Sequence, residues 1–297
     1  MFDFRLKVFN TTAKRLSFTK AASELYITQP AVTKHINEIE KHFNVMLFER
    51  NGTKIKLTPA GELLLQHTEK LFTLHHDLEL DMKGFGNKQE GILRVGASTT
   101  IAQYILPPVL AAFKKRYPNI QPELHIHNTE HIEASLERDE IDLGVTEGSF
   151  KNTSFKYIPF LKDELVLVVR EKHELLKKQS ISLTELTQLP LLIREPGSGT
   201  LDVIADALAK HKVKLSNLTI EMRMESTEAM KQYIANSDTA AFLSVYSVYN
   251  ELKQGRFSIM DIKGLSINRD LFFIQKHGTE KQLQSVFMDF ALHYNLR

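Results

Sequence analysis

The 297-residue chain contains no cysteine, which excludes disulfide bonds and thiolate metal sites. No stretch approaches 18 uninterrupted apolar residues, so we expect no membrane-spanning helix. The first ten residues, MFDFRLKVFN, carry charges within their apolar run and no small-residue cleavage site, so we expect no signal peptide. Together these absences are compatible with a reducing compartment, and we expect a cytoplasmic protein.

The charge of the chain is low overall but unevenly distributed. The net charge is +2, which by itself does not indicate a polyanionic partner. Residues 1–58, however, contain ten Lys and Arg side chains against five Asp and Glu, so this segment carries +5 and the remainder −3. The length allows two or three domains, and 42% hydrophobic residues with 25% charged residues are typical of a soluble globular protein.

Residues 1–58 combine three helical patterns with a hairpin signal. The second pattern, SFTKAASEL, begins with Ser17 as a candidate N-cap, and the third, LYITQPAVTKHINEIEKHF, has Thr28 as N-cap and Pro30 in its first turn. Two short extended runs then flank Asn51-Gly52, a strong signal for a two-residue hairpin turn. Three helices followed by a hairpin predict a winged helix-turn-helix.

The remaining residues divide into a long helix and an α/β region. Residues 59–90 contain no proline after Pro59, and leucines recur close to heptad spacing at Leu64, Leu71, Leu74 and Leu78. This pattern favours a linker or dimerisation helix, although a core helix of one large domain is the alternative. Residues 91–297 alternate apolar strands with amphipathic helices, which predicts doubly wound parallel sheets in two linked lobes.

The third helical pattern has an unusual polar face. Gln29, Thr33 and Asn37 recur every four residues, while Val32 and Ile36 face inward. Glutamine, threonine and a neighbouring lysine suit hydrogen bonding to base edges and phosphates in a DNA major groove. The alternative is a solvated face of a small helical bundle.

A contiguous stretch of about fifty residues resembles the LysR-type transcriptional regulators. It runs SFTKAASELYITQPAVTKHINEIEKHFNVMLFERNGTKIKLTPAGELLL and contains paired alanines, a Thr-Gln-Pro-Ala-Val core, LFER and LTPAG. The resemblance implies a winged helix-turn-helix (1–58), a dimerising linker helix and hinge (59–90) and a two-lobed effector domain of periplasmic-binding-protein type (91–297), with lobe I at about 91–162 and 266–297 and lobe II at about 163–265. It also implies DNA contacts, by position, for Thr28, Gln29, Pro30, Thr33, Lys34, Asn37, Arg50, Thr53 and Lys54.

Lys34 departs from that family's pattern, since arginine is common at its position. Lysine cannot make the planar two-point contact of arginine, so we expect Lys34 to contact phosphate rather than to read guanine. Gln29 and Thr33 are then the expected base-reading residues, with a larger contribution from DNA shape and dimer geometry.

Two loops of the α/β region combine hydroxyl groups with a helix start. One contains Ser98, Thr99 and Thr100, and the other, in REPGSGT, contains Ser198 and Thr200. Free backbone N–H groups and the helix dipole favour an anion there, although glycine, serine and threonine are also ordinary capping residues.

The family resemblance places the effector in the cleft between the lobes, at these two loops. Thr146, Glu147 and Gly148, which follow IDLGV, are predicted to form a third such loop, and residues 242–244 a fourth. The REPGSGT motif resembles that of the family branch that controls sulfur assimilation and carbon fixation. This resemblance favours a small anion as the effector. Arg194 can neutralise such an anion or pair with Glu147 or Glu195, and Glu147 would repel it unless paired. The predicted effector-binding residues are Ser98, Thr99, Thr100, Thr146, Glu147, Arg194, Ser198, Thr200 and Ser244.

The predicted function is sequence-specific, effector-controlled regulation of transcription. The expected partners are promoter DNA, a small-molecule co-inducer, further copies of the chain in a homodimer or homotetramer, and RNA polymerase; no catalytic residue, cofactor, metal or membrane contact is expected. A transport-type solute-binding module would need an export signal, and an enzyme would need a second acid or base beside Glu147. The histidines at 125, 127 and 131 lack a carboxylate cluster and are expected to serve surface or packing roles.

Overall fold

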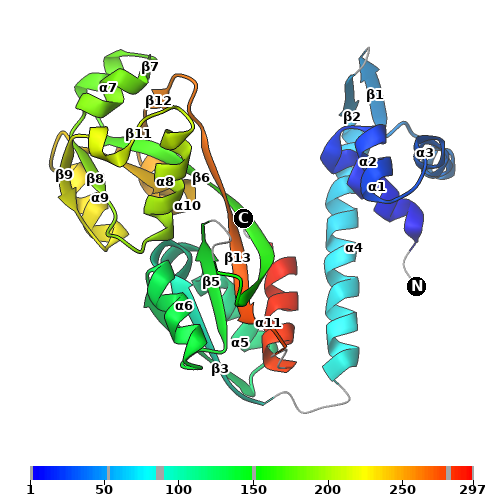
Figure 1. Ribbon diagram of the computed structural model, residues 1–297. Helices are drawn as coiled ribbons and strands as arrows, with labels where there is room; N and C mark the ends of the chain where they lie inside the picture. The colour runs from blue at the N-terminus through cyan, green and yellow to red at the C-terminus, as the bar shows by residue number, and fades with distance from the viewer. Residues whose placement is uncertain (1–2, 52–53, 85–89, 149–151, 279–281, 296–297) are drawn as a thin grey trace. The chain divides into compact units, whose positions relative to one another are not determined.

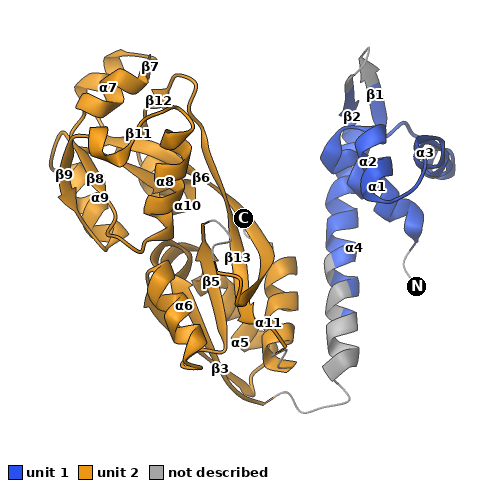
Figure 2. Ribbon diagram, in the orientation of Figure 1, with its two compact units in different colours: residues 1–88 blue, residues 89–297 orange. Residues whose placement is uncertain are grey.

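The structure is a computed structural model that describes residues 3–51, 54–84, 90–148, 152–278 and 282–295. The chain forms two compact units, residues 1–88 and residues 89–297 (Figure 2). Among the helices within the described ranges, none has the length and apolar character to cross a membrane.

The first unit is a winged helix-turn-helix followed by a long helix (Figure 1). Asp3, Ser17 and Thr28 cap three of its helices by accepting backbone N–H groups, as expected for these side chains. The predicted order of three helices and a hairpin is therefore confirmed. The elements are α1 (Phe4–Arg15), α2 (Phe18–Glu24), α3 (Gln29–Phe43), β1 (Phe48–Asn51), β2 (Lys54–Leu57) and α4 (Pro59–Gly84).

A small apolar core holds this unit together. Phe9 of α1 is fully buried and its ring centroid lies 5.7 Å from that of Phe48 on β1. Val32 and Ile36 are also buried, so the inner face of α3 packs on this core and the polar face stays outside. The pairing of Asn51 with Lys54 extends β1 through Asn51, which the sequence placed in the turn.

The start of α4 packs closely against the hairpin. A Cβ atom at Gly61 would lie 2.2 Å from the carbonyl oxygen of Leu47, so this contact requires glycine. Along the same helix Leu71, Leu74 and Leu78 are exposed within the first unit. These three leucines are therefore not part of the core of the winged helix, whereas Leu64, the first leucine of the stripe, packs against it.

The second unit contains one nine-stranded sheet shared by two lobes. The strand order is β4-β3-β5-β13-β6-β10-β8-β9, and β11 also pairs with β6. The strands of this sheet are β3 (Gly91–Ser98), β4 (Ile120–His127), β5 (Leu143–Glu147), β6 (Phe155–Arg170), β8 (Leu191–Ile193), β9 (Ile220–Arg223), β10 (Ala240–Ser244), β11 (Phe257–Ile259) and β13 (Ile267–Lys276). Two short strands, β7 (Ser180–Ile181) and β12 (Asp261–Ile262), pair with each other in a separate two-stranded sheet.

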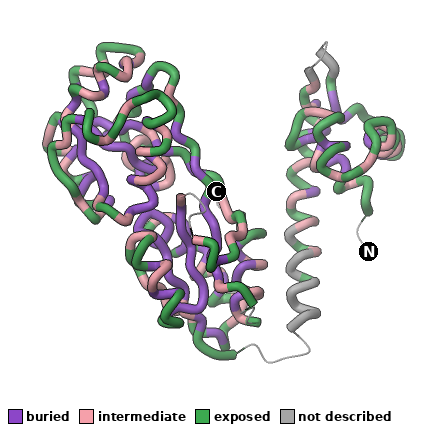
Figure 3. The backbone as a smooth tube through the Cα atoms, viewed as in Figure 1, coloured by how far each residue is buried: buried purple, intermediate pink, exposed green. Residues whose placement is uncertain are grey.

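Lobe I is built on β3, β4 and β5, and lobe II on β8, β9 and β10. The helical elements are η1 (Ile101–Ile105), α5 (Leu106–Arg116), α6 (Thr129–Glu137) and α11 (Gln282–His293) in lobe I, and η2 (Glu174–Lys177), α7 (Leu183–Gln188), α8 (Gly199–Ala209), η3 (Leu215–Asn217), α9 (Thr227–Ala235) and α10 (Val245–Lys253) in lobe II. In each lobe the buried strands are covered by helices with exposed outer faces (Figure 3).

The two long strands β6 and β13 run antiparallel from one lobe into the other (Figure 1). Pairing of β13 with β5 and of β10 with β6 is also antiparallel, whereas β3, β4 and β5 pair in parallel. The sequence predicted parallel sheets, and the sheet is mixed because the chain passes twice between the lobes. This crossing brings Asp163 and Arg269 opposite each other.

Candidate functional site

The polar face of α3 is open to contact. Gln29, Pro30, Lys34 and Asn37 are exposed and Thr33 is half-buried, while the apolar face packs inward. Thr33 donates its hydroxyl hydrogen to the carbonyl oxygen of Gln29 at 3.2 Å. The Thr33 hydroxyl can therefore still accept a hydrogen bond from DNA, and its methyl group can contact a thymine methyl.

The remaining predicted DNA contacts lie at the start of α3 and on the hairpin. The hydroxyl oxygen of Thr28 accepts the Ala31 N–H at 3.3 Å, so Thr28 serves as the cap that begins α3. Thr53 and the side chains of Arg50 and Lys54 lie outside the described residues. Lys56 on β2 is exposed and described.

Glu147 is held by hydroxyl groups from both lobes. Its carboxylate accepts a hydrogen bond from Ser98 at the end of β3 in lobe I. It accepts a second one, at 2.9 Å, from Thr200 in the first turn of α8 in lobe II. Its side chain is only 2% exposed, so these hydroxyls and Arg269 replace solvent around the charge.

Arg269 supplies the positive charge of this cluster from the hinge strand β13. Its Nη1 donates to Thr200 Oγ1 at 2.8 Å and lies 3.3 Å from Glu147 Oε1. Its Nε donates to Asp163 Oδ2 at 2.7 Å, while Nη2 lies 2.7 Å from the same oxygen without hydrogen-bond geometry. Ser244 donates to the other Asp163 oxygen at 2.8 Å. We call these six residues (Ser98, Glu147, Asp163, Thr200, Ser244, Arg269) the hinge network.

Arg194 belongs to a neighbouring pair rather than to the hinge network. It binds Glu195 through two hydrogen bonds, of 2.8 and 3.0 Å, and donates to the Thr99 hydroxyl across the lobes at 3.3 Å. Of the two predicted roles, the structure shows the pairing with Glu195. Thr100 and Ser198 are buried beside these loops.

The residues assigned to the third and fourth predicted loops lie at the carboxyl ends of strands. Thr146 and Glu147 are the last residues of β5, and Ser244 is the last residue of β10. Thr146, Glu147 and Ser244 are therefore strand residues and not loop residues. The side chains nevertheless lie at strand carboxyl ends, so they reach the same region as the Ser98 and Thr200 loops.

The lobes approach each other closely beside this network. The Glu130 N–H donates to the carbonyl oxygen of Gly197 at 3.2 Å, which links lobe I to lobe II through backbone. A Cβ atom at Gly199 would lie 2.4 Å from the carbonyl oxygen of Glu147. Glycine is therefore required where α8 begins against the end of β5.

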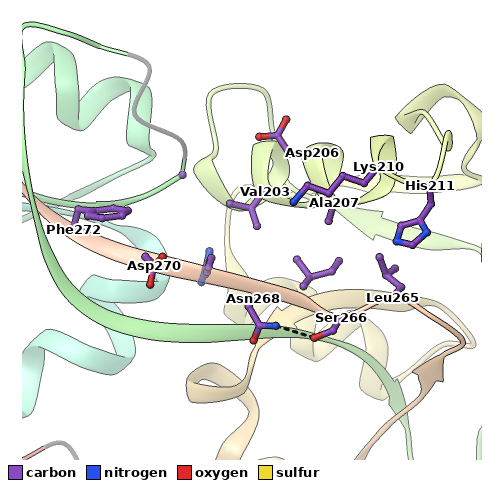
Figure 4. Close-up of a pocket in the computed structure, with 13 residues that line it drawn as sticks. Val203, Asp206, Ala207, Lys210, His211, Leu265, Ser266, Asn268, Asp270 and Phe272 are labelled. Carbon is purple, nitrogen blue, oxygen red and sulfur yellow. Dashed lines mark hydrogen bonds between the residues drawn. The ribbon is translucent and has the colours of Figure 1, made fainter. Parts of the chain in front are cut away.

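Two cavities border the region where the lobes meet. The first, of about 430 Å³, is lined by Thr99, Ile126, His127, Asn128, His131, Glu195, Glu225 and Ser226; we call it the outer cleft. The second, of about 270 Å³, lies between α8 and β13 (Figure 4). There Val203 of α8 and Lys210, which caps the end of α8, face the start of β13, where Asn268 donates to Ser266 at 2.9 Å. Arg269 lines the second cavity and also belongs to the hinge network.

The histidines near the outer cleft show no metal-binding arrangement. His131 Nδ1 lies 2.7 Å from the side-chain oxygen of Asn128, and the His127 and His131 rings are 6.1 Å apart. Within the part of the chain that the structure describes, no three His, Cys, Asp or Glu side chains are grouped to hold a metal ion.

Sequence reasoning missed Arg269 and Asp163, although a signal was present. In the segment INRDLFFIQ, Arg269 alternates with Ile267 and Leu271, so the period of two places it on the buried face. Asp163 likewise precedes Leu165 by two residues on a strand that is apolar beyond it. A charge at an inward position of a buried strand indicates a paired or functional group.

A winged helix-turn-helix and a two-lobed α/β domain with a polar interlobe cluster define a class of DNA-binding regulators with a ligand-binding domain. Comparison with known families matches residues 4–62 to the bacterial regulatory helix-turn-helix proteins of the lysR family and residues 86–295 to the LysR substrate binding domain. The chain belongs to the LysR family.

Several known regulators are similar to this chain in sequence or structure. A probable RuBisCO transcriptional regulator of Trichormus variabilis is 32% identical over 91% of this chain and 81% of its own length. The transcriptional regulator CysL of Bacillus subtilis is 29% identical over 91% of this chain and 89% of its own. The regulatory domain of Synechocystis CcmR, solved in complex with 2-PG, has a TM-score of 0.62 at 28% identity over 68% of this chain and 96% of that one.

Proposed function

We propose that the chain regulates transcription by binding specific promoter DNA in response to a small anionic effector held between its lobes. The observation that carries the proposal is the Glu147 carboxylate, which is enclosed by one hydroxyl from each lobe and by Arg269. This arrangement supports the proposal, because donors from both lobes and from the strand β13 between them already hold a carboxylate. A ligand that uses the same donors can therefore change how the lobes meet.

An anionic effector must compete with Glu147. The two buried arginines, Arg194 and Arg269, face the three carboxylates of Glu147, Asp163 and Glu195, so this region has a formal charge of −1. An added anion is repelled unless it takes over the hydroxyls and the arginine that now hold Glu147. The 2-PG complex of CcmR supports a small effector in this fold.

The effector proposal is tested with Glu147→Gln and thermal shift measurements on the full chain. We expect 2-PG, phosphate or sulfate to stabilise the variant at lower concentration than the parent, because the competing charge is gone. Glu137→Gln, an exposed change on α6, is the matched control. Equal responses of all three proteins to every anion would reject the donors around Glu147 as the effector site.

The effector signal reaches DNA through paired winged helices. We propose a homodimer or homotetramer joined through the exposed leucines of α4, Leu71, Leu74 and Leu78. Lobe closure then changes the separation of two heads, whose half-sites on one face of DNA lie roughly 34 Å apart or a multiple of it.

The DNA-binding face combines base readout with phosphate contacts. We propose that Gln29 and Thr33 read bases, that Pro30 and Asn37 contact the groove beside them, and that Lys34 anchors a phosphate. Thr28 fixes the start of α3, and Arg50, Thr53 and Lys54 make the DNA contacts of the wing.

Titrating cognate and random duplexes at several salt concentrations tests these roles. Gln29→Ala is expected to lose about 1–3 kcal/mol of discrimination at one base pair. Lys34→Ala is expected to weaken all sequences alike and to lower the salt slope by about 1. Lys253→Ala, which removes an exposed charge from α10, is the control. Equal effects of Gln29→Ala on cognate and random DNA would contradict the assignment.

The proposal involves no chemistry on the effector and no prosthetic group or metal ion. It places the protein in the cytoplasm, with promoter DNA, the effector and RNA polymerase as partners. An enzyme that used the hinge network would need a convergent acid and base there. The hinge-network carboxylates are instead committed to Arg269 and the hydroxyls around it.

A further inference from the structure

A second set of contacts joins the lobes, separate from the hinge network. It starts at Tyr104 in η1, a short π-helix of lobe I that directly follows the Ser98–Thr100 loop. The Tyr104 hydroxyl donates to Glu228 Oε1 on α9 of lobe II. Burial raises the pKa of the Tyr104 phenol, and the hydrogen bond to Glu228 raises it further, so the hydroxyl remains a donor at physiological pH.

Lys231 makes this contact a charged cluster. Its side chain is only 6% exposed, and its Nζ lies 2.8 Å from Glu228 Oε1 and 2.7 Å from Glu251 Oε1. The same Nζ lies 5.1 Å from the centroid of the Tyr104 ring. A buried ammonium group needs such partners, because they offset the free energy lost when the charge is removed from water.

The cluster lies on the two elements that border the outer cleft. Thr99, which lines the cleft, lies just before η1, and Ser226, which lines it from lobe II, caps α9 by accepting the Ala229 N–H. Tyr104 and Glu228 follow on these same elements. Separation of the lobes at the cleft therefore breaks the Tyr104–Glu228 bond and removes the aromatic ring from Lys231.

We propose that Tyr104 is a positioning residue that holds lobe II against lobe I and sets the balance between the open and closed cleft. The closed state gains one hydrogen bond to a charged group and one ring–cation contact that the open state lacks. Loss of the hydroxyl alone is expected to raise the ratio of open to closed molecules about tenfold. The inference goes beyond the proposed function, since it requires no effector.

The absence of native cysteine allows a direct distance measurement between the lobes. Lys115→Cys on α5 and Gln179→Cys in lobe II place spin labels at two exposed positions of the full chain. Double electron–electron resonance without ligand is expected to show a second distance population in Tyr104→Phe that is minor in the parent. Tyr249→Phe is the matched control, because Tyr249 is 60% exposed on α10.

A second variant separates loss of the contact from loss of folding. Glu228→Gln removes the charge that Tyr104 and Lys231 share. It is expected to shift the distances in the same direction, and the double variant with Tyr104→Phe should shift them by less than the two single effects combined. Unchanged far-UV circular dichroism identifies folded variants. Distance distributions of Tyr104→Phe and Glu228→Gln that both superimpose on the parent would overturn the proposal.

Discussion

Replacing Arg269 by methionine removes the single cation of the hinge network while keeping an unbranched side chain of similar reach. The guanidinium of Arg269 is 1% exposed and contacts Asp163 and Glu147, which are themselves 0% and 2% exposed. After the substitution both carboxylates remain buried without their counter-ion. The Thr200 hydroxyl also loses the donor that orients it toward Glu147.

The expected loss of unfolding free energy is large, because the Asp163 and Glu147 carboxylates stay buried after Arg269 is removed. Breaking a buried ion pair by removing one member typically costs about 3–5 kcal/mol, far more than an exposed pair. Two carboxylates share Arg269, so we expect the upper part of that range. Replacing the partners as well, with Asp163→Asn and Glu147→Gln, should recover most of the loss, since the triple variant buries neutral groups that can still hydrogen-bond.

Urea denaturation of the full chain, followed by far-UV circular dichroism, measures this cost. The transition of the second unit should shift to lower urea with an unchanged slope. Hydrogen exchange should rise in β6 and β13, where the pair joins the lobes. A loss below about 1 kcal/mol, or a loss that the companion substitutions do not reduce, would refute the view that Arg269 stabilises both buried carboxylates.

Three further predictions concern other parts of the chain. Gly61→Ala should destabilise the first unit by about 1–3 kcal/mol in urea denaturation, because its Cβ atom would meet the Leu47 carbonyl; a gain in stability would contradict the close contact. Phe9→Ala should cost about 3–5 kcal/mol in the same assay, and a cost below 1 would contradict its place in the core. The pKa of Glu185 is lowered from 4.5 to about 2, first by the hydrogen bond from Lys178, so its contribution to stability is present above pH 4.5 and is lost as the pH falls toward 2. Carbon-13 NMR titration should show this pKa rising in Lys178→Met, and an unchanged value would contradict the cause.

The sequence predicted the winged helix well because its signals are local. A cap at Thr28, helical spacing of Val32 and Ile36, and hairpin residues near Asn51 each act within a few positions. The polar face of α3 follows from the same periodicity, since the inner face must pack on the core. Its role in DNA binding remains a prediction that the exposed side chains allow.

The effector region was only partly predictable, because its contacts join distant strands. Ser98 and Thr200 were predicted as binding residues from their loops, but the sequence left open whether Glu147 had a partner. That partner is Arg269, 122 positions further along the chain by residue number. Such a contact depends on which strands pair and on the register between them, and a single sequence does not specify which strands become neighbours.

The sequence by itself therefore determined the element types, the order of the two units and the family to which the chain belongs. Helix caps, apolar periodicity and contiguous motifs are short-range properties, and they depend little on the rest of the fold. Tertiary structure alone decided that β6 and β13 cross between the lobes and that Glu147 pairs with Arg269. It also decided that Tyr104 meets Lys231 across the lobes. These contacts depend on strand order and lobe closure, in which residues far apart in sequence share one buried, low-dielectric space.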